Sequence, residues 1–385
     1  MIKLLLDYLR EAGIHFPGMG LMGYISFRAS IAACISILTA LFAGRRIIAS
    51  LQKHQIGETI RDLGLQGQME KKGTPTMGGV IIIVSILISA LLVCDLTSIY
   101  TWLMIGTTLW CGALGFADDY IKVFKHNKEG LSERKKLVGQ IVLGLLIALA
   151  VCLSSEIITD KVVTTIPFVK AHEFDYSWIS PFKGQMGVYC TWAVYVVMIV
   201  LVITACSNGA NLTDGMDGLS AGTSAIVGAV IGIMAWLSGD VLDARYLNIM
   251  YIPGSGEIAV YMASFIGALL GFLWFNTYPA QVFMGDTGSL TIGGIIGVSA
   301  VLIRKELILP ILCGIFVAES LSVILQRAHF RRTKRKYGEG RRLFLMAPLH
   351  HHFQKKGMPE PRIVSRFWIV GIILGLATLA ILKIR

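Results

Sequence analysis

Carboxylate and amide side chains gather in short, glycine-rich segments between long apolar runs. The segment SNGANLTDGMDGL, residues 207–219, has an acid or an amide at every third position: Asn208, Asn211, Asp214 and Asp217. On a helical turn, neighbouring members of this row lie within reach of one another. Carboxylate and amide oxygens are ligands that Mg²⁺ prefers, and amides can also read a sugar or a base. Because the segment has no Lys or Arg to balance its acids, an ordinary polar turn is the less favoured interpretation.

Two adjacent acids, Asp118 and Asp119, end the apolar run Tyr100–Ala117. Successive helical positions point about 100° apart, so the two carboxylates cannot form a single clamp. One acid can face a metal or a substrate while the other orients a cation. Taken alone, the pair also fits two solvated acids at the end of a membrane span, and both interpretations stay open.

A third acid, Asp286, stands between Gly285 and Gly288 just before another apolar run. This position suits an N-terminal helix cap, and equally an acid that holds a metal near phosphates at the positive end of a helix. Phe283, in the same segment, is a candidate stacking surface for a nucleobase, although an aromatic residue at a membrane interface is the more usual explanation.

Basic and hydroxyl groups occur in two further segments. Lys72 and Thr76 lie in EKKGTPTMGG, residues 70–79, where lysines, hydroxyls and glycine amides together can hold phosphate oxygens. His350, His351 and His352 are consecutive, in a region with twelve Lys or Arg and two acids (residues 326–366). Zinc sites use wider histidine spacing, so binding of anionic phosphates is favoured. In an extended backbone His350 and His352 would share a face, whereas on a helix the three rings fan out.

The elements that must position these groups are membrane helices. Of 385 residues, 55% are hydrophobic and 15% are charged, whereas a soluble protein usually has about 25% charged residues. Ten apolar runs approach the ~20 residues that cross a bilayer. They are Leu21–Ala43, Met77–Val93, Tyr100–Ala117, Leu137–Leu153, Val188–Cys206, Leu219–Trp236, Ile258–Phe275, Leu290–Ile303, Leu307–Leu325 and Phe367–Leu382. The eighth is short and glycine-rich, which keeps nine spans as an alternative. We therefore expect an all-α polytopic membrane protein with about ten transmembrane helices, forming a single integral domain over residues 1–385.

The basic residues predict the orientation of these spans. One alternating set of loops holds 24 Lys and Arg and the other holds 10. By the positive-inside rule the first set is cytoplasmic and both termini face outward. Its larger loops are expected at residues 44–76, 118–136 and 326–366. All the polar segments described above belong to this set, which predicts an active-site cleft at the cytoplasmic face. Because the basic charge follows topology, nucleic-acid binding is not expected; Glu319, inside the ninth run, is only a weak indication of an ion path.

Acids able to hold Mg²⁺, flanked by basic groups at a membrane surface, suit phosphoryl transfer between a nucleotide diphosphate and a lipid phosphate. Six separated motifs carry a resemblance that agrees with this chemistry. They are TPTMGG at 74–79, FADDYIKV at 116–123, GLSERKKL at 130–137, NLTDGMDGL at 211–219, FNTYPAQVFMGDTGSL at 275–290 and APLHHHFQKKG at 347–357. Over nearly its full length the chain resembles the phospho-N-acetylmuramoyl-pentapeptide transferases, a family of polyprenyl-phosphate N-acetylhexosamine-1-phosphate transferases.

The resemblance implies a reaction and its partners. Such an enzyme transfers phospho-MurNAc-pentapeptide from its UDP donor to undecaprenyl phosphate, giving lipid I and UMP, with Mg²⁺, in the bacterial cytoplasmic membrane. Homodimers are common in the family, but no interface can be read from the sequence. A sister enzyme that transfers GlcNAc-1-phosphate is the first alternative, which the APLHHHF stretch disfavours. A transporter is the second, although it would not need acids and histidines gathered on one side.

The resemblance also implies residue roles. Asp286 matches the magnesium ligand, and Asp118 with Asp119 matches an aspartate pair that deprotonates the lipid phosphate or helps to hold metal. Substrate contacts are implied for these positions: Lys72, Thr76, Asn211, Asp214, Asp217, Asn276 and Phe283. At least one histidine among 350–352 is expected near the diphosphate or the sugar. Departures from the family pattern are Gln281 and Gln354, and the long outward loops near residues 160–187 and 239–256.

Overall fold

The computed structural model describes residues 1–14, 17–54, 73–125, 127, 130–154, 162–166 and 173–382. Most of these residues are helical, which confirms the all-α fold class. The helices are α1 Ile2–Glu11, α2 Ile25–His54, α3 Gly79–Val93, α4 Ile99–Phe124, α5 Glu133–Leu153, α6 Gly184–Thr213, α7 Leu219–Gly239, α8 Val241–Leu247, α9 Gly256–Asn276, α10 Gly285–Leu302, α11 Leu309–Leu312, α12 Gly314–Tyr337, α13 Leu349–Lys355 and α14 Glu360–Ile381. Short 3₁₀ turns are η1 Met19–Gly23, η3 Tyr176–Ile179 and η4 Glu306–Ile308. The one sheet in the described chain pairs β1 (Val163–Thr165) antiparallel with β2 (Glu173–Asp175).

The helices account for the apolar runs. In the described part of the chain eight helices are long and apolar enough to cross a membrane, and a bent pair, Glu306–Leu312 with Gly314–Tyr337, would make nine. The 15-residue helix α3 covers the remaining run. The short eighth run is a full helix, α10, whereas the ninth is broken by a 77° bend. The chain is therefore a multi-pass membrane protein.

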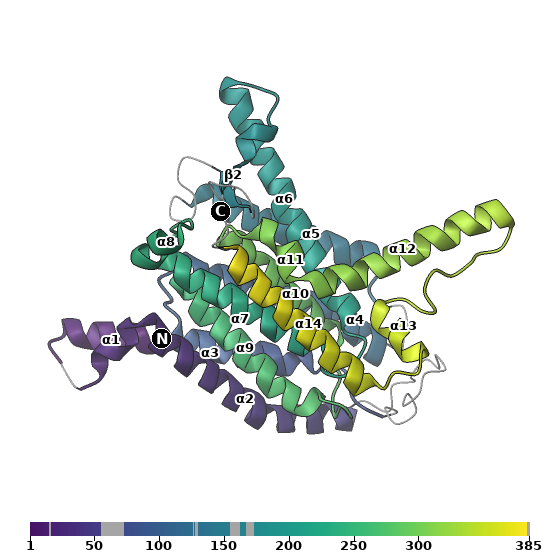
Figure 1. The fold of residues 1–385 in the computed structure, drawn as a ribbon. Coiled ribbons are helices and arrows are strands. Elements are labelled where there is room, and N and C mark those ends of the chain that lie inside the picture. Colours follow the sequence, from purple (N-terminus) through teal and green to yellow (C-terminus); the bar gives the residue numbers. More distant parts are fainter. Residues whose placement is uncertain are drawn as a thin grey trace.

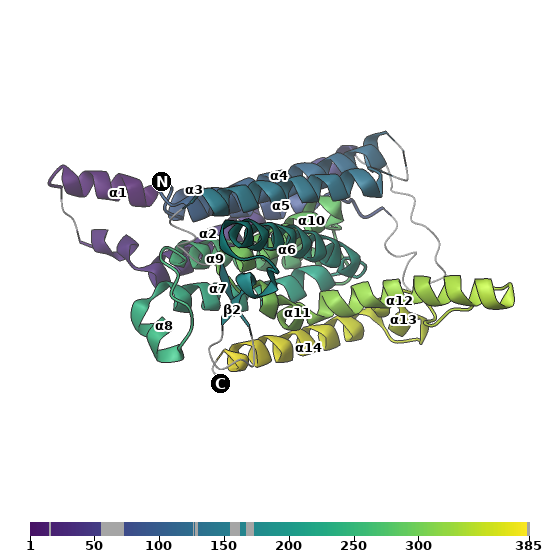
Figure 2. The same cartoon turned by 90° about the horizontal axis from the view of Figure 1, so that it is seen from above.

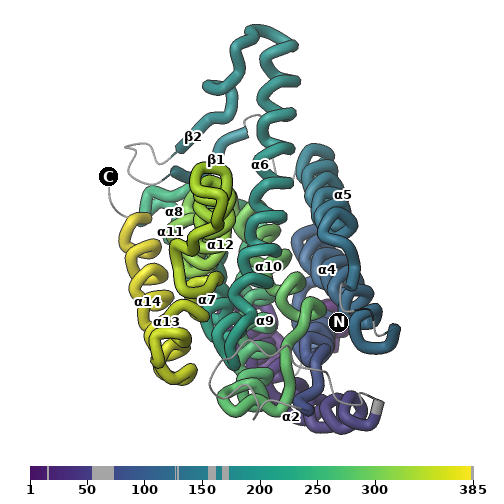
Figure 3. The backbone as a smooth tube through the Cα atoms, turned by 90° about the vertical axis from the view of Figure 1, so that its right-hand side faces the viewer, coloured from purple at the N-terminus to yellow at the C-terminus, as the bar shows by residue number. Residues whose placement is uncertain are grey.

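Helix α10 forms the centre of the bundle. Figure 2 shows α3 and α4 on one side of the molecule, α12 and α14 on the other, and α10 among the helices between them; Figure 3 shows α10 from the side. Glycines let neighbouring helices approach α10 closely: a Cβ at Gly79 would lie 2.1 Å from the Gly288 nitrogen, and a Cβ at Gly115 would lie 2.2 Å from the Asp286 carbonyl oxygen. The second approach places the end of α4 against the first turn of α10.

The expected cytoplasmic loops are shorter than the hydropathy pattern predicted. Helix α2 continues to His54, so the loop expected at 44–76 begins later. Within 118–136, α4 continues to Phe124 and α5 begins at Glu133. Within 326–366, α12 continues to Tyr337 and projects from the bundle, and α13 and the start of α14 follow (Figure 1). Hydropathy marks the part of a helix that suits hydrocarbon, whereas backbone hydrogen bonding continues through polar residues that suit water.

Candidate active site

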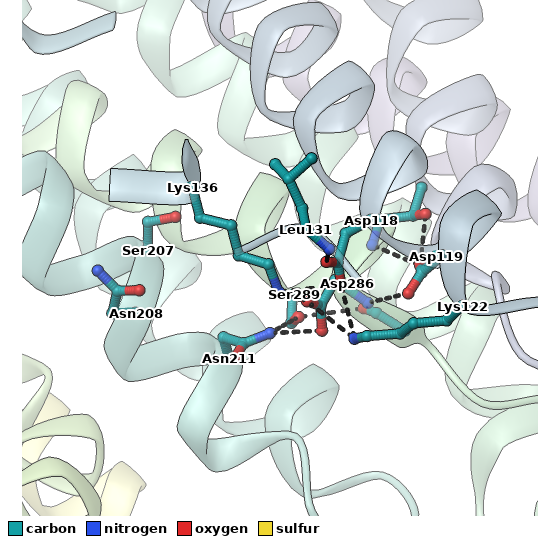
Figure 4. Close-up of polar contacts among 12 residues, drawn as sticks. Asp118, Asp119, Lys122, Leu131, Lys136, Ser207, Asn208, Asn211, Asp286 and Ser289 are labelled. Carbon is teal, nitrogen blue, oxygen red and sulfur yellow. Dashed lines mark hydrogen bonds and ion pairs between the residues drawn. The ribbon is translucent and has the colours of Figure 1, made fainter. Parts of the chain in front are cut away.

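Helices α4 and α10 bring together the three acids that the sequence singled out. One carboxylate oxygen from each of Asp118, Asp119 and Asp286 lies within 4.8 Å of the other two. Figure 4 shows the three side chains pointing toward one another where α4 meets α10. Asp118 and Asp119 are buried, and Asp286 is half-buried. Hard oxygen donors gathered at this spacing could hold a divalent cation.

Asp119 caps α10 from a different helix. Its carboxylate accepts hydrogen bonds from the Asp286 nitrogen (3.1 Å), the Thr287 nitrogen (2.8 Å) and the Thr287 hydroxyl (2.6 Å). The first N–H groups of a helix have no partner within it, and a carboxylate also favours the positive end of the helix dipole. The interpretation of Asp286 as the cap was wrong: Asp286 lies inside the first turn, and its side chain faces Asp118 and two lysines.

Two lysines neutralise the acids. Lys122, one helical turn after Asp118, has its Nζ 2.5 Å from Asp118 Oδ2 and 3.3 Å from Asp286 Oδ2. Lys136, in α5, has its Nζ 2.9 Å from Asp118 Oδ2 and also contacts Asp286 Oδ2. Asp118 Oδ1 accepts the Leu131 N–H at 2.6 Å, which fixes the start of the segment leading to α5. The cluster thus combines two cations with acids on neighbouring helices.

Asn211 completes the cluster from α6. Its amide nitrogen donates to Asp286 Oδ1 and to the Ser289 hydroxyl, both at 2.9 Å. One turn earlier on α6, Asn208 exchanges amide hydrogen bonds with buried Gln140 of α5, at 2.9 and 3.3 Å. Gln140 lies one turn after Lys136. This amide pair sets the register of α5 against α6, so that Lys136 and Asn211 both reach Asp286.

Only the first half of the Asn/Asp row is helical. Helix α6 ends at Thr213, so Asp214 and Asp217 lie in the turn that follows and do not continue the helical face that the spacing predicted. Glycines and acids favour leaving the helix here. Burial raises the pKa of Asp214 well above its usual range, and the carboxylates of Asp286, Asp119 and Asp217 raise it further. A site in which neighbouring acids raise one another's pKa is one that a cation would stabilise.

The turn after α6 is fastened to the segment before α10. Asp217 accepts the Ala280 N–H at 3.1 Å, and its own N–H donates to Glu360 of α14 at 2.8 Å. Buried Asn276 accepts the Gly218 N–H at 3.0 Å and donates to the Val282 carbonyl at 2.9 Å. Asp217 and Asn276 therefore hold the backbone that surrounds the cluster.

The segment before α3 runs beside the same loop. The Phe283 N–H donates to the Pro75 carbonyl, and the Gly78 N–H donates to the Phe283 carbonyl, both at 2.8 Å. Thr76 is buried, and its hydroxyl would lie 3.0 Å from a Cβ at Gly285. Thr76 and the half-buried Phe283 thus lie next to the first turn of α10. Lys72 lies outside the described residues.

The three histidines lie on a helix, α13, and have different surroundings. His350 is buried: its Nδ1 is 3.1 Å from Glu319 Oε2, and a Cβ at Gly215 would lie 2.1 Å from its Nε2. The His350 backbone N–H donates to Glu319 Oε1 at 3.2 Å, so Glu319 holds the start of α13. His351 is half-buried, with its Nδ1 3.2 Å from Gln354 Oε1. His352 accepts the Leu345 N–H at 3.1 Å; partial burial and the Lys356 cation lower its pKa, which suits an acceptor nitrogen. Through Gly215, His350 links α13 to the turn that carries Asp214 and Asp217.

Four site residues were not singled out by sequence reasoning: Lys122, Lys136, Gln140 and Glu360. The spacing of Asp118 and Lys122, four residues apart on a helix, was a usable signal. Lys136 lies in the basic motif GLSERKKL, in which nothing local distinguishes it from Lys135. Gln140 and Glu360 act through long-range contacts that leave no local pattern.

Comparisons with known proteins agree with this geometry. Residues 101–304 match the family described as "Glycosyl transferase family 4", and residues 71–83 match "Phospho-N-acetylmuramoyl-pentapeptide-transferase signature 1". Proteins named phospho-N-acetylmuramoyl-pentapeptide-transferase from Parabacteroides distasonis, Flavobacterium psychrophilum and Porphyromonas gingivalis are 53%, 50% and 51% identical, over the whole of both chains in each case. The chain belongs to the phospho-N-acetylmuramoyl-pentapeptide-transferase family.

Proposed function

We propose that this protein transfers phospho-MurNAc-pentapeptide from UDP-MurNAc-pentapeptide to undecaprenyl phosphate, giving lipid I and UMP. The observation that carries the proposal is the cluster of Asp118, Asp286, Lys122 and Lys136 where α4, α5 and α10 meet. Its mixture of acids and lysines suits a reaction between two phosphate groups. Relatives that share about half of its residues over the full length carry the name of this activity.

The donor set fits Mg²⁺. Asp286 would be its principal ligand, with Asp118 beside it, and Asn211 and Lys136 orient the Asp286 carboxylate. Asp119 would contribute mainly by holding the first turn of α10. When bound, Mg²⁺ would neutralise negative charge on the diphosphate and on the leaving group.

The chain's own groups then divide the remaining work. Lys122 and Lys136 would attract phosphate oxygens and stabilise the charge that develops during transfer. Undecaprenyl phosphate is already largely ionised at neutral pH, so Asp118 would serve more to position the lysines and the acceptor than to remove a proton.

The uridine donor would bind where the turn after α6 meets the segment before α10. Phe283 supplies a half-exposed ring. Thr76 would lie toward the phosphates, and Lys72 is proposed as a further phosphate contact on the resemblance alone. Asp217 and Asn276 would act through the backbone that they hold, and Asp214 would face the donor or the cation. Of the histidines, His351 would approach the diphosphate or the sugar, because His350 and His352 are engaged with Glu319 and Leu345.

The proposed setting is a single integral domain in the bacterial cytoplasmic membrane. The acid–lysine cluster would open to the cytoplasm and both termini would face outward. A homodimer is the assembly that the resemblance offers, and the oligomeric state stays open. These assignments are supported by the distribution of Lys and Arg between the two sets of loops and by membership of the family.

The test is UMP release by the purified protein in detergent, with undecaprenyl phosphate and UDP-MurNAc-pentapeptide, with and without Mg²⁺. UMP that appears only with this donor and with Mg²⁺ supports the proposal. UMP formed from UDP-GlcNAc instead would assign the chain to the sister activity. Folded protein that releases UMP from neither donor would contradict the transferase function.

A further inference from the structure

Helix α12 leaves the bundle at a steep angle. It is bent by 77° from the Glu306–Leu312 segment before it, and Figures 1 and 2 show its outer end projecting beyond the neighbouring helices. From Lys334 to Glu339 every side chain is exposed. The side chains of this outer half can therefore contact solvent, lipid or another molecule.

One face of α12 changes from apolar to cationic along its length. Residues 321, 325, 328, 332 and 335 are spaced by four, three, four and three, which keeps them on one side of a helix. The face begins with Leu321 and Leu325, which are 48% and 49% exposed. It ends among four exposed cations: Arg331, Arg332, Arg335 and Lys336. We call these four residues the cationic face.

The charge of the cationic face is not neutralised within the described chain. The sequence has no acid between Glu319 and Glu339, and none of the four cations forms an ion pair with a described residue. With Ala328 they line a shallow hollow of about 470 Å³. Several cations around one hollow make a site for an anionic group such as a phosphate.

The outer half of α12 is held in place by the chain that returns from it. Buried Thr333 accepts the Arg341 N–H at 2.8 Å, and Gln326 accepts the N–H groups of Leu343 (3.0 Å) and Phe344 (2.9 Å). The cationic face is thus presented by an ordered helix, so that a ligand meets an arrangement of charges that is already formed.

The order of side chains along this face identifies the partner. A helix that emerges obliquely from a bilayer passes first through hydrocarbon and then through the headgroup layer, and it needs apolar and then basic side chains on the same side. Leu321 and Leu325 followed by Arg332 and Arg335 have this order. A soluble acidic protein or a nucleic acid would require the charges but not the exposed leucines that precede them.

We propose that the cationic face of α12 binds the anionic headgroups of membrane phospholipids. The surface is separate from the acid–lysine cluster at Asp286. Its function would be to fix the depth of α12, and of the returning segment that leads to α13, in the headgroup layer.

The proposal is tested by native mass spectrometry of the full-length protein titrated with phosphatidylglycerol in detergent. The test variant carries Arg331→Gln, Arg332→Gln and Arg335→Gln. A matched control removes three exposed cations at the end of α2 by Arg45→Gln, Arg46→Gln and Lys53→Gln, and a rescue variant replaces the same three arginines of α12 by Lys. Each variant is mixed with the unmodified protein, so that both compete for the same lipid.

We expect the test variant to bind the first phosphatidylglycerol at least about fivefold more weakly, since a basic residue near a membrane surface gives roughly that factor. The control should stay within about twofold of the unmodified protein, the rescue variant should retain most of the affinity, and phosphatidylcholine binding should not change. Equal affinity of the test variant and the unmodified protein would overturn the proposal, as would an equal loss in the control. Unchanged lipid binding with weaker binding of UDP would assign the hollow to the donor instead. Because lipid binding is read directly, these outcomes do not depend on transferase activity.

Discussion

Two groups of charged side chains lie at opposite ends of α10, and they differ in how far solvent reaches them. At the first turn, Asp118, Asp286, Lys122 and Lys136 contact one another, and the side chains of Lys122, Lys136 and Asp286 are 31%, 19% and 15% exposed. Beyond the last turn, Lys305 donates to the Thr165 hydroxyl at 2.7 Å and Glu306 accepts from Tyr176 at 3.0 Å. Both Lys305 and Glu306 are no more than 2% exposed.

The difference separates a group of charges that can meet a substrate from one that holds the chain together. Around Lys305, the partners belong to the β1–β2 hairpin and η3, and the Arg304 carbonyl accepts the Thr165 N–H at 3.0 Å. Those contacts fasten the β1–β2 hairpin to the end of α10. Around Asp286, the charges converge on one another and reach solvent, which leaves them able to exchange partners. A buried charge is functional evidence only when ligands can reach it.

The largest effect that tests this comparison is expected from Asp286→Asn. We expect kcat to fall by about 10³-fold or more, because the variant removes a carboxylate charge at the centre of the cluster while its shape is kept. UMP release measures the loss. The matched variant at the other end is Glu306→Gln, which should leave kcat per folded molecule unchanged. A comparable loss of kcat in Glu306→Gln would contradict the division between the two groups.

A smaller effect is expected when a lysine is removed from each group. Lys136→Met should lower kcat/KM by about 10²-fold, because one of two cations next to the phosphates is lost. Lys305→Met should instead change thermal stability in detergent and leave kcat/KM within about twofold. Steady-state kinetics and a melting curve on both variants make the comparison. The interpretation fails if Lys136→Met loses stability but keeps its activity.

Substitutions of the two adjacent aspartates should also have different effects, one on stability and the other on activity. Asp119→Ala removes an acceptor for three donors at the start of α10, so we expect the protein to lose about 2 kcal/mol of stability. Asp118→Asn should lower activity with little change in melting temperature, because Asn keeps an oxygen for the Leu131 N–H and the other carboxylate oxygen meets two partly exposed lysines. Thermal unfolding and UMP release are measured on both. Equal losses of stability in the two variants would show that the pair acts as one structural unit.

Much of the fold could be predicted from the sequence, because hydropathy reports directly which segments suit hydrocarbon. The positions of helix ends could not, since α2, α4 and α12 continue through polar residues. The bend before α12 also left no hydropathy signal. The chain between Leu302 and Glu306 was expected to turn between two spans, whereas its Arg304 and Lys305 also anchor the β1–β2 hairpin.

For the site, too, the local sequence predicts which residues take part, but it does not predict contacts between residues far apart in the chain. Asp118, Asp119 and Asp286 could be recognised from residue type and position, and the structure brings them together. Their individual contacts could not be predicted, since Asp119 reaches the backbone of α10, which is 167 residues away along the chain. The choice of Lys136 over its neighbours depends on how α5 is rotated against α6, which the contact of Gln140 with Asn208 sets.

The smallest predicted effect is the pH dependence of stability that arises from buried Lys305 at the end of α10. Burial lowers the pKa of Lys305 from 10.5 to about 8, against the attraction of Glu306. Below about pH 8 both the folded and the unfolded protein hold this proton, and the folded state carries the full cost of the buried charge. As the pH rises further, the folded protein loses the proton first, so stability relative to Lys305→Met should increase by at most about 1.4 kcal/mol per pH unit.

Melting temperatures of the unmodified protein and of Lys305→Met between pH 7 and 9.5 measure this difference. The upper limit keeps the unfolded tyrosines largely protonated, and burial next to Glu306 raises the pKa of Tyr176 further, so its hydroxyl stays protonated throughout. A stability difference that rises from pH 8 to 9.5 would show that Lys305 is sealed from water in the folded protein. A flat difference would mean that water reaches it, and the group at Lys305 would then resemble the one at Asp286 more closely than its contacts indicate.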